Sequence, residues 1–402
     1  MRFLKALLVF LLIIAILGGA GFAYYYFVLN KAEVIVSVNT YPFKLKIGDQ
    51  DFGEIGAKDF YAKVEPGTYT IVAQKEDFKD FVLENFNIGR GEKKEIEIEF
   101  VMDVTIEEVS DKVISFASLY HDKNELFFVD QGKIAISSLN LSDMTEKEVL
   151  SLPFYFDDIR KVTFSPLFNK AVLSCFDKNS NAEKLTFFDL KIKKRVDFHT
   201  SIHDVSFSPD GLKIAYVFPG SENNGYLSTA NSDGSQWENV DELEFNRADT
   251  RWSPDGKYIA VFSKEETGNE NLDNKIYVVD IVNKKKTEKT LPGFCEEVIW
   301  APSGSKMLCA TSNKETSDTN IWYIDPFSNV QKDLGNGKKA CWSKDESAVF
   351  VVSSDDYIYK VDLETRGRIL LSEKSFASIS FVAAIEGSLY FVGNGKLYKM
   401  TF

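Results

Sequence analysis

The chain has 402 residues, which is enough for two or three domains, and its formal net charge at pH 7 is −13. This acidic balance repels a nucleic-acid backbone, and no basic patch interleaved with aromatic residues offsets it, so nucleic acid is excluded as a partner. Aromatic residues make up 14% of the chain, and short Val- and Ile-rich runs alternate with Gly, Asp, Asn and Pro, which predicts an all-β fold of many short strands.

The first thirty residues combine positive charge with a long apolar run. Arg2 and Lys5 precede an uncharged stretch at 6–29, which as a helix would extend about 36 Å. We therefore expect a transmembrane signal anchor at 6–29, a cytoplasmic tip at 1–5, and residues 31–402 outside the cytoplasm of a single-pass cell-membrane protein, with the membrane as a partner. The alternative is a signal peptide cleaved before Tyr24, which would leave the protein secreted or periplasmic.

Residues 31–101 have the pattern of a small β domain. Alternating apolar residues, a Gly-bounded turn and the turn at Pro66-Gly67 predict strands that pack as a minimal sandwich. The stretches "VIVSVNTYPFKLKIGDQDFG", "VEPGTYTIVAQKEDFKDF" and "IGRGEKKEIEIEF" resemble the PEGA domain over 33–100, although "YPFK" replaces the residues that give this family its name. The resemblance implies a binding or spacing role without catalytic residues.

Residues 102–402 repeat a strand-rich unit. The motif "FSPDGLKIAYVF" at 207–218 returns as "WSPDGKYIAVFS" at 252–263, and weaker copies begin at residues 164, 300 and 342. Successive units begin 39 to 48 residues apart, which matches one four-stranded propeller blade. The aromatic residues that mark the units are Phe116, Phe164, Phe207, Trp252, Trp300, Trp342 and Phe381.

The repeated motif has the residues of a β-hairpin turn. Pro209 presets φ for a turn, Asp210 can cap the turn through its carboxylate, and Gly211 supplies positive φ before the next strand. The last unit has room for three strands only, so we expect the stretch at 102–109 to provide the fourth and to close a β-propeller of seven blades, with six or eight as alternatives. The repeats resemble the TolB-type propeller, which implies that fold but no single function.

Few residues have the pattern of a catalytic or a metal-binding site. A catalytic Ser would need a G-x-S-x-G elbow on a separate α/β domain, and the chain has neither such a motif nor spare length. His199 and His203, in "HTSIHD", have the spacing of metal ligands on a helix but lie where a turn enters a strand, so we expect a solvated loop, no metal and no cofactor. Buried free thiols are expected for the four Cys residues, with a Cys309–Cys341 disulfide as the alternative.

One positional pattern points to a binding surface. Three residues before the marker aromatic, three successive units carry Asp204, Asp249 and Glu297. In a ring these acids would lie on adjacent blades near one mouth of the channel, where propellers usually bind ligands. A solvated rim with balancing charges is the alternative. The equivalent positions of the other units are Lys161, Lys339 and Ser378.

From these features we expect a non-enzymatic, membrane-anchored binding protein that uses the propeller to engage a protein, a peptide or an envelope polymer, with Asp204, Asp249 and Glu297 as ligand-binding residues. One alternative is an envelope hydrolase or lyase that acts on polysaccharide at the channel mouth. A purely structural envelope linker is another, which a broad exposed apolar patch would favour.

Overall fold

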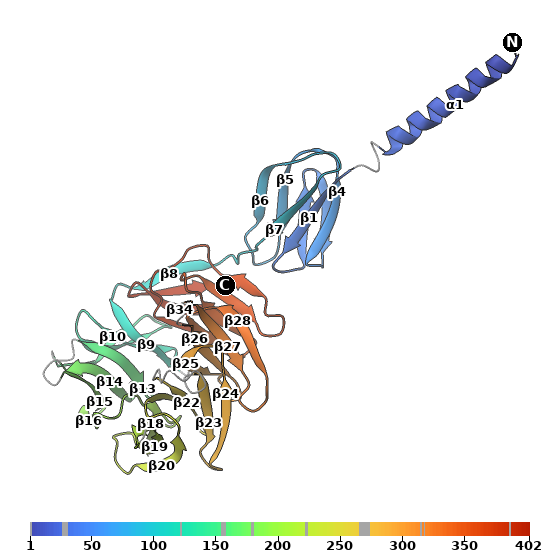
Figure 1. The fold of residues 1–402 in the computed structure, drawn as a ribbon. Helices are drawn as coiled ribbons and strands as arrows, with labels where there is room; N and C mark the ends of the chain where they lie inside the picture. Colours follow the sequence, from blue (N-terminus) through green and yellow to red (C-terminus); the bar gives the residue numbers. More distant parts are fainter. Residues whose placement is uncertain are drawn as a thin grey trace. The chain divides into compact units, whose positions relative to one another are not determined.

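The computed structural model describes residues 2–25, 31–120, 123–153, 158–177, 181–221, 224–264, 274–313, 316, 318–385 and 387–402, with side chains from residue 10 onward. Tertiary contacts divide the chain into two compact units (Figure 1). The first comprises residues 1–103 with 367–371, and the second comprises residues 104–366 with 372–402.

Helix α1 covers Arg2–Tyr24. No helix within the described residues is long and apolar enough to cross a membrane. The predicted signal anchor at 6–29 is therefore wrong, and so are the membrane as a partner and the single-pass localisation that were derived from it. The prediction counted the apolar run to Leu29, whereas helix α1 is assigned as far as Tyr24. Residues 26–30 of the predicted span lie outside the described residues.

The first unit packs two sheets around one apolar core. One sheet has the order β4 (Asp59–Val64), β1 (Ala32–Val38), β7 (Lys93–Ile98), and the other has the order β3 (Gln50–Ile55), β2 (Phe43–Ile47), β5 (Gly67–Gln74), β6 (Phe81–Ile88). Val34 and Val36 of β1 are buried in the same core as Leu45 of β2 and Ile71 of β5. The predicted alternation of inward and outward side chains along β1 and β2 is confirmed.

The described part of residues 104–402 contains seven four-stranded sheets (Figure 1). In six of them the strands pair in chain order. The first three of these are β9 (Ile114–Tyr120), β10 (Glu125–Asp130), β11 (Ala135–Asn140), β12 (Glu146–Ser151); β13 (Ile159–Phe164), β14 (Lys170–Asp177), β15 (Ala182–Asp189), β16 (Lys194–Asp197); and β17 (Ser206–Phe207), β18 (Lys213–Pro219), β19 (Gly225–Asn231), β20 (Glu238–Leu243). The next three are β21 (Ala248–Trp252), β22 (Tyr258–Ser263), β23 (Lys275–Asp280), β24 (Lys285–Thr290); β25 (Phe294–Trp300), β26 (Met307–Ser312), β27 (Thr319–Ile324), β28 (Gln331–Asn336); and β29 (Lys339–Trp342), β30 (Ala348–Val352), β31 (Ile358–Asp362), β32 (Arg368–Leu370).

The seventh sheet joins distant parts of the sequence. Its order is β33 (Phe381–Ile385), β34 (Ser388–Gly393), β35 (Lys396–Thr401), β8 (Thr105–Ser110). Strand β8 pairs antiparallel with β35, and Ile106 lies opposite Met400. The predicted pairing of the stretch at 102–109 with the last unit is confirmed.

Side-chain packing holds neighbouring sheets together. Phe127 of β10 packs with Leu173 of β14, and Phe128 of β10 packs with Tyr390 of β34, so the first sheet shares apolar clusters with both the second and the seventh. Strand pairing joins strands only within each sheet, so the sheets are not closed into one hydrogen-bonded ring. The predicted fold class, a transmembrane helix, a sandwich and a closed propeller, is therefore wrong as it stood: apart from α1, the described residues form an all-β fold, and the second unit is propeller-like.

The repeated turn has the geometry that its residues dictate. In the third sheet the Ser208 hydroxyl donates to Asp210 Oδ1 at 2.5 Å, and the same oxygen accepts from the Leu212 amide at 3.0 Å. Gly211 has a φ of 65°, which a residue with a side chain adopts only with strain. Ser253 and Asp255 make the same bond at 2.6 Å in the next sheet. The motif is thus architectural.

Replacing Asp210 by Ala is expected to lower the free energy of unfolding by about 1–2 kcal/mol, because two hydrogen bonds of the turn are lost. Asp210→Asn keeps an acceptor oxygen and should lose less. Denaturant unfolding of both variants measures the difference. Equal losses would mean that charge, not the bonding pattern, matters at this position.

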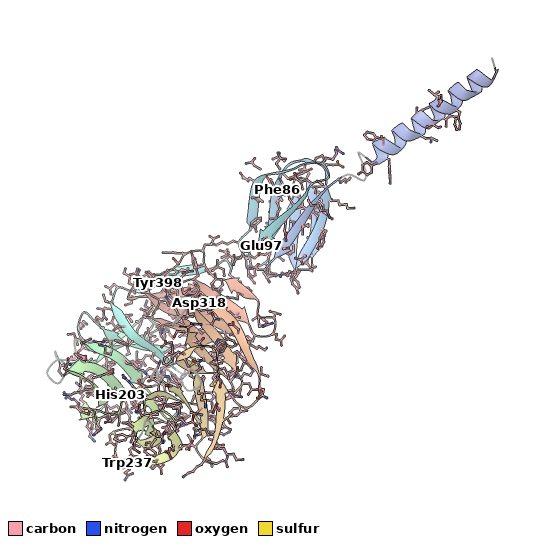
Figure 2. The ribbon with its side chains drawn as sticks, in the orientation of Figure 1. Phe86, Glu97, His203, Trp237, Asp318 and Tyr398 are labelled. Carbon is pink, nitrogen blue, oxygen red and sulfur yellow. A yellow bond between two sulfur atoms is a disulfide. The ribbon has the colours of Figure 1, made fainter. Side chains whose placement is uncertain are left out.

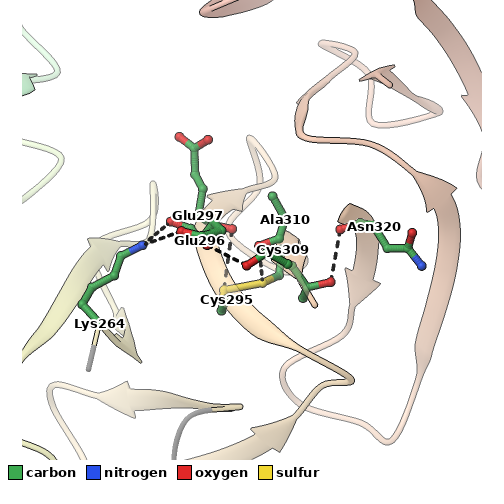
Figure 3. The surroundings of a disulfide bond; sticks show 9 residues. Lys264, Cys295, Glu296, Glu297, Cys309, Ala310 and Asn320 are labelled. Atoms are coloured by element: carbon green, nitrogen blue, oxygen red, sulfur yellow. Dashed lines mark hydrogen bonds and ion pairs between the residues drawn. A yellow bond between two sulfur atoms is a disulfide. The ribbon is translucent and has the colours of Figure 1, made fainter. Parts of the chain in front are cut away.

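A disulfide joins Cys295 of β25 to Cys309 of β26, while Cys175 and Cys341 are not part of a disulfide (Figure 3). Both predictions for the thiols are therefore wrong: two of the four are not free, and the pairing is not Cys309–Cys341. Sequence could not select the partner, because it does not show that the strand of Cys309 pairs with that of Cys295, whereas Cys341 lies on β29 in another sheet.

In unfolded, unreduced protein, a thiol reagent is expected to count two free thiols, and four after reduction. The double variant Cys295→Ala, Cys309→Ala should lower the free energy of unfolding by about 3 kcal/mol, the value for a short closed loop. Four thiols without reductant would contradict the pairing.

Candidate functional site

The three acidic residues predicted to bind a ligand come from three successive sheets. Asp204 lies just before β17, Asp249 lies in β21 and Glu297 lies in β25. The exposed fraction of the side chain is 3% for Asp204, 14% for Asp249 and 39% for Glu297. Two of the three predicted residues are therefore inside the unit, and the third is at its surface.

Lys161 of β13 joins the two buried carboxylates. Its Nζ lies 2.6 Å from Asp204 Oδ1 and 3.1 Å from Asp249 Oδ2. Lys161 belongs to the second sheet, Asp204 precedes the first strand of the third sheet, and Asp249 belongs to the fourth. A single ammonium group of the second sheet therefore binds carboxylates from the third and the fourth. The structure thus brings together Asp204, Asp249 and Lys161, three of the positions that the repeat alignment selected.

Arg251 completes this group. It follows Asp249 by two positions on the same strand, so both side chains lie on one face of the sheet. Its Nη1 lies 3.0 Å from Asp204 Oδ2, and its Nη2 lies 3.8 Å from Asp249 Oδ2. The guanidinium carbon is 5.6 Å from the ring centroid of Phe262. We call Lys161, Asp204, Asp249 and Arg251 the ion-pair cluster.

The cluster keeps its members charged. Burial raises the pKa of Asp249, but the charges of Lys161, Arg251 and Lys264 outweigh burial, and the net pKa is lowered. For Arg251, burial lowers the pKa, and the charges of Asp204, Asp249 and Glu297 more than restore it. Asp249 is consequently a carboxylate, and Arg251 a cation, throughout the neutral range.

Glu297 and the remaining predicted positions lie outside the cluster. Glu297 Oε2 is 3.8 Å from the Nζ of Lys339, at the limit of an ion pair. Ser378 instead donates its backbone N–H to Asp356 Oδ2 at 3.2 Å. Its marker aromatic, Phe381, begins strand β33, whereas Trp252 and Trp300 end theirs, so counting back from Phe381 leaves the strand.

His203 lies next to Asp204 and was considered only as a metal ligand. Burial lowers its pKa, and the charge of Arg247 lowers it further, against the opposing effects of Glu183 and Asp249. The imidazole is therefore neutral at pH 7 and free to accept a proton. Figure 2 shows His203 within the sheets of the second unit.

Lys264 adds a further cation at the end of β22. Its Nζ donates to the backbone oxygen of Glu296 at 2.6 Å and lies 3.5 Å from Glu296 Oε2 (Figure 3). It also lies 5.3 Å from the ring centroid of Phe262, the ring that Arg251 contacts. Its charge contributes to the lowered pKa of Asp249.

Sequence reasoning missed Arg251, Lys264 and the role of His203. A signal existed for Arg251, because a residue two positions from a selected strand residue shares its face. Lys264 follows a strand end and is selected by no spacing rule. His203 was hidden because its pKa depends on Arg247 and Glu183, which come from other sheets.

Comparison with known proteins gives the following relatives. No family model matches the chain, so neither the PEGA nor the TolB resemblance is confirmed. The chain is similar to the structure of an oligogalacturonate lyase in complex with manganese, with a TM-score of 0.54 and 13% identity over 75% of this chain and 91% of that one. It is also similar to an oligogalacturonate lyase from Vibrio parahaemolyticus, with a TM-score of 0.57 and 12% identity over 74% of this chain and 93% of that one.

A curated protein also matches. Dipeptidyl-peptidase 5 of Porphyromonas gingivalis is 33% identical over 136 residues, which are 31% of this chain and 19% of that protein. The chain thus spans about a fifth of the length of the curated relative that it matches. The solved structures show the fold, since their identity to the chain is low.

The manganese of one neighbour raises the question of a metal site. Among the described residues, no group of three or more His, Cys, Asp or Glu side chains is placed to hold a metal ion. The buried carboxylates of Asp204 and Asp249 are already bound by Lys161. The donor set of the part of the chain that the structure describes therefore does not fit a metal.

All of these relatives are enzymes by their names. They point toward an enzyme and contradict the prediction of a non-enzymatic protein. That prediction failed because it rested on the absence of a serine-elbow motif and of a metal-ligand spacing, while the titratable groups of this chain converge only in the folded second unit. The chain is thus an all-β protein whose propeller-like fold is similar to that of the oligogalacturonate lyases.

Proposed function

We propose that the second unit is a lyase that cleaves a uronate-containing polysaccharide by β-elimination, with His203 as the general base. The observation that carries this proposal is a neutral imidazole beside a buried cluster that holds two cations in place. The names of the structural neighbours, which act on an oligogalacturonate, support the substrate class.

Hydrolysis is less well supported by the same residues. A glycoside hydrolase needs one carboxylic acid that is protonated at its working pH, which requires a raised pKa. The pKa of Asp249 is lowered, and Asp204 is 3% exposed and bound by both Lys161 and Arg251. Neither carboxyl group is suited to protonate a leaving oxygen.

Elimination requires a base and a cation. His203 removes the proton from the ring carbon next to the substrate carboxylate, the electron pair forms a carbon–carbon double bond, and the bond to the departing sugar oxygen breaks. That oxygen takes a proton from solvent, and the imidazolium returns its proton to solvent, so no water is consumed overall. Arg247, which is exposed and close enough to lower the pKa of His203, is placed to neutralise the substrate carboxylate.

The test incubates the full chain with polygalacturonate and, separately, with an uncharged glucan. Elimination gives an unsaturated uronate that absorbs in the ultraviolet, together with new reducing ends, from polygalacturonate alone. Reducing ends without the absorbance would identify a hydrolase and overturn the elimination mechanism. Binding of the polymer without cleavage would overturn the enzyme proposal and favour an interaction platform.

A further inference from the structure

The second unit also contains a cavity that the ion-pair cluster does not line. Its volume is about 680 Å³, and it is lined by residues from β16, from the segment after it and from the third sheet, β17 to β20. None of the cluster residues lines it. Its aromatic lining residues are Phe198, His199, Tyr216, Phe218, Tyr226 and Trp237.

Trp237 forms the exposed part of this lining. It precedes β20, and 64% of its surface is exposed (Figure 2). A large aromatic side chain beside a cavity, with one face open to solvent, provides a flat apolar surface for a ligand ring. The other lining aromatics continue this surface inward.

Tyr216 is the most deeply buried aromatic residue of the lining. Its side chain is only 5% exposed and packs with Val205 and Phe207. The hydroxyl does not belong to the buried polar atoms that lack a hydrogen-bond partner in the described residues, so it is open to the cavity. Burial raises its pKa, so the group keeps its proton and can donate it. A hydroxyl that is open to a cavity is able to donate a hydrogen bond to a ligand oxygen.

The polar groups of the wall are mostly neutral donors. The Ser201 amide donates to His199 Nδ1 at 3.2 Å, so in the neutral ring the proton is on Nε2. The Ser228 hydroxyl donates to Asn239 Oδ1 at 2.9 Å, which leaves the Asn239 amide N–H groups for a ligand.

The acidic lining residues are already balanced. Asp197 Oδ2 lies 3.0 Å from Arg195 Nη2, and Asp233 Oδ2 lies 3.2 Å from Lys194 Nζ. These pairs leave no net charge for an ionic ligand to meet. The ligand should therefore be neutral, with one flat apolar face and several hydroxyl groups around its edge.

We propose that this cavity binds a neutral pyranose unit of an oligosaccharide, which stacks on Trp237 and accepts a hydrogen bond from the Tyr216 hydroxyl. A pyranose ring has both an apolar C–H face and hydroxyls on its rim. An apolar peptide side chain would cover Trp237 but would offer no acceptor to the Tyr216 hydroxyl. The site is independent of the proposed lyase reaction.

Calorimetric titration of the full chain with neutral oligosaccharides of glucose, N-acetylglucosamine, mannose and xylose tests the proposal. At least one of them should bind, Trp237→Ala should weaken its binding about tenfold or more, and Tyr216→Phe, which removes only the hydroxyl, should weaken it several-fold. Tyr61→Ala is the matched control, because Tyr61 is 62% exposed and lies in the first unit.

Three results would overturn the site. These are the absence of binding by all four oligosaccharides, equal binding by Trp237→Ala, and binding only of a phenylalanine-containing peptide, which would indicate a peptide pocket. Far-ultraviolet circular dichroism of each variant shows whether it has folded. Tyr216→Phe keeps the ring and its packing, so it remains informative if Trp237→Ala is damaged.

Discussion

Replacing His203 by Gln is expected to lower the elimination rate on polygalacturonate by a factor of about 10² to 10⁴, the usual contribution of a general base. Glutamine keeps a polar side chain of similar reach but cannot accept a proton at neutral pH. The Michaelis constant should change little, because His203 acts on the proton that is transferred and not on the polymer as a whole.

The pH dependence gives an independent readout. Only the neutral imidazole accepts a proton. The rate should therefore rise with pH and level off once the imidazolium form of His203 has been deprotonated. Because burial and the charge of Arg247 lower the pKa of His203, the midpoint should lie below the ordinary value of 6.5. His203→Gln should abolish this step in the profile.

Arg160→Gln is the control for changes near the cluster, since Arg160 adjoins Lys161 in sequence but pairs with Asp158 at the surface. Its rate and pH profile should match those of the unchanged protein. A His203→Gln variant with an unaltered rate would remove His203 as the base, whatever the fate of the cavity at Trp237.

Replacing Asp204 by Ala is expected to lower the free energy of unfolding by about 3–5 kcal/mol, the cost of breaking a buried ion pair by removing one partner. The reason is that Asp204 satisfies two cations at once, Lys161 at 2.6 Å and Arg251 at 3.0 Å. Without it, Lys161, which is 35% exposed, and Arg251, which is 23% exposed, share a single carboxylate, Asp249.

Denaturant unfolding measures this loss. Asp158→Ala, which removes an exposed ion pair with Arg160, is the control and should cost no more than about 1 kcal/mol. The double variant Asp204→Leu, Arg251→Met should recover part of the loss, because Lys161 and Asp249 then remain as a pair at 3.1 Å. A small effect of Asp204→Ala would mean that water already solvates the cluster.

The cluster also makes stability depend on pH. The pKa of Asp249 is lower in the folded protein than its ordinary value of 3.8. Its contribution to stability is therefore complete above the unfolded pKa and is lost as the pH falls through the folded one. Acid unfolding of Asp249→Asn should consequently be less steep than that of the unchanged protein.

Much of the second unit could be predicted because short stretches of sequence determine its turns and strands. The turn at Ser208-Pro209-Asp210-Gly211 forms hydrogen bonds within five residues, and its recurrence placed the hairpins of several sheets correctly. The pairing of β8 with β35 could also be predicted, since the last unit had only three strands and an unpaired edge is costly. Counting positions back from the marker aromatic failed at Phe381, because Phe381 begins its strand while most of the equivalent aromatic residues end theirs.

Other features depended on contacts that sequence does not contain. The pairing of Cys295 with Cys309 required the register of β25 against β26, which sets the two residues on adjoining strands. The length of α1 could not be predicted, because the apolar run continues past Tyr24, the last residue assigned to the helix. The cavity at Tyr216 and Trp237 required the packing of β16 against the third sheet.

The amino-acid sequence by itself determined the all-β character and the position of the repeated turns, because these follow from side-chain periodicity and from φ preferences that act over a few residues. It also selected Lys161, Asp204 and Asp249 by their equivalent positions. Only the tertiary structure decided that these three meet Arg251 in one cluster, that burial and Arg247 lower the pKa of His203, and that Tyr216 lines a cavity. Charge pairing and burial are properties of groups brought together from different sheets, and no local pattern encodes which groups those are.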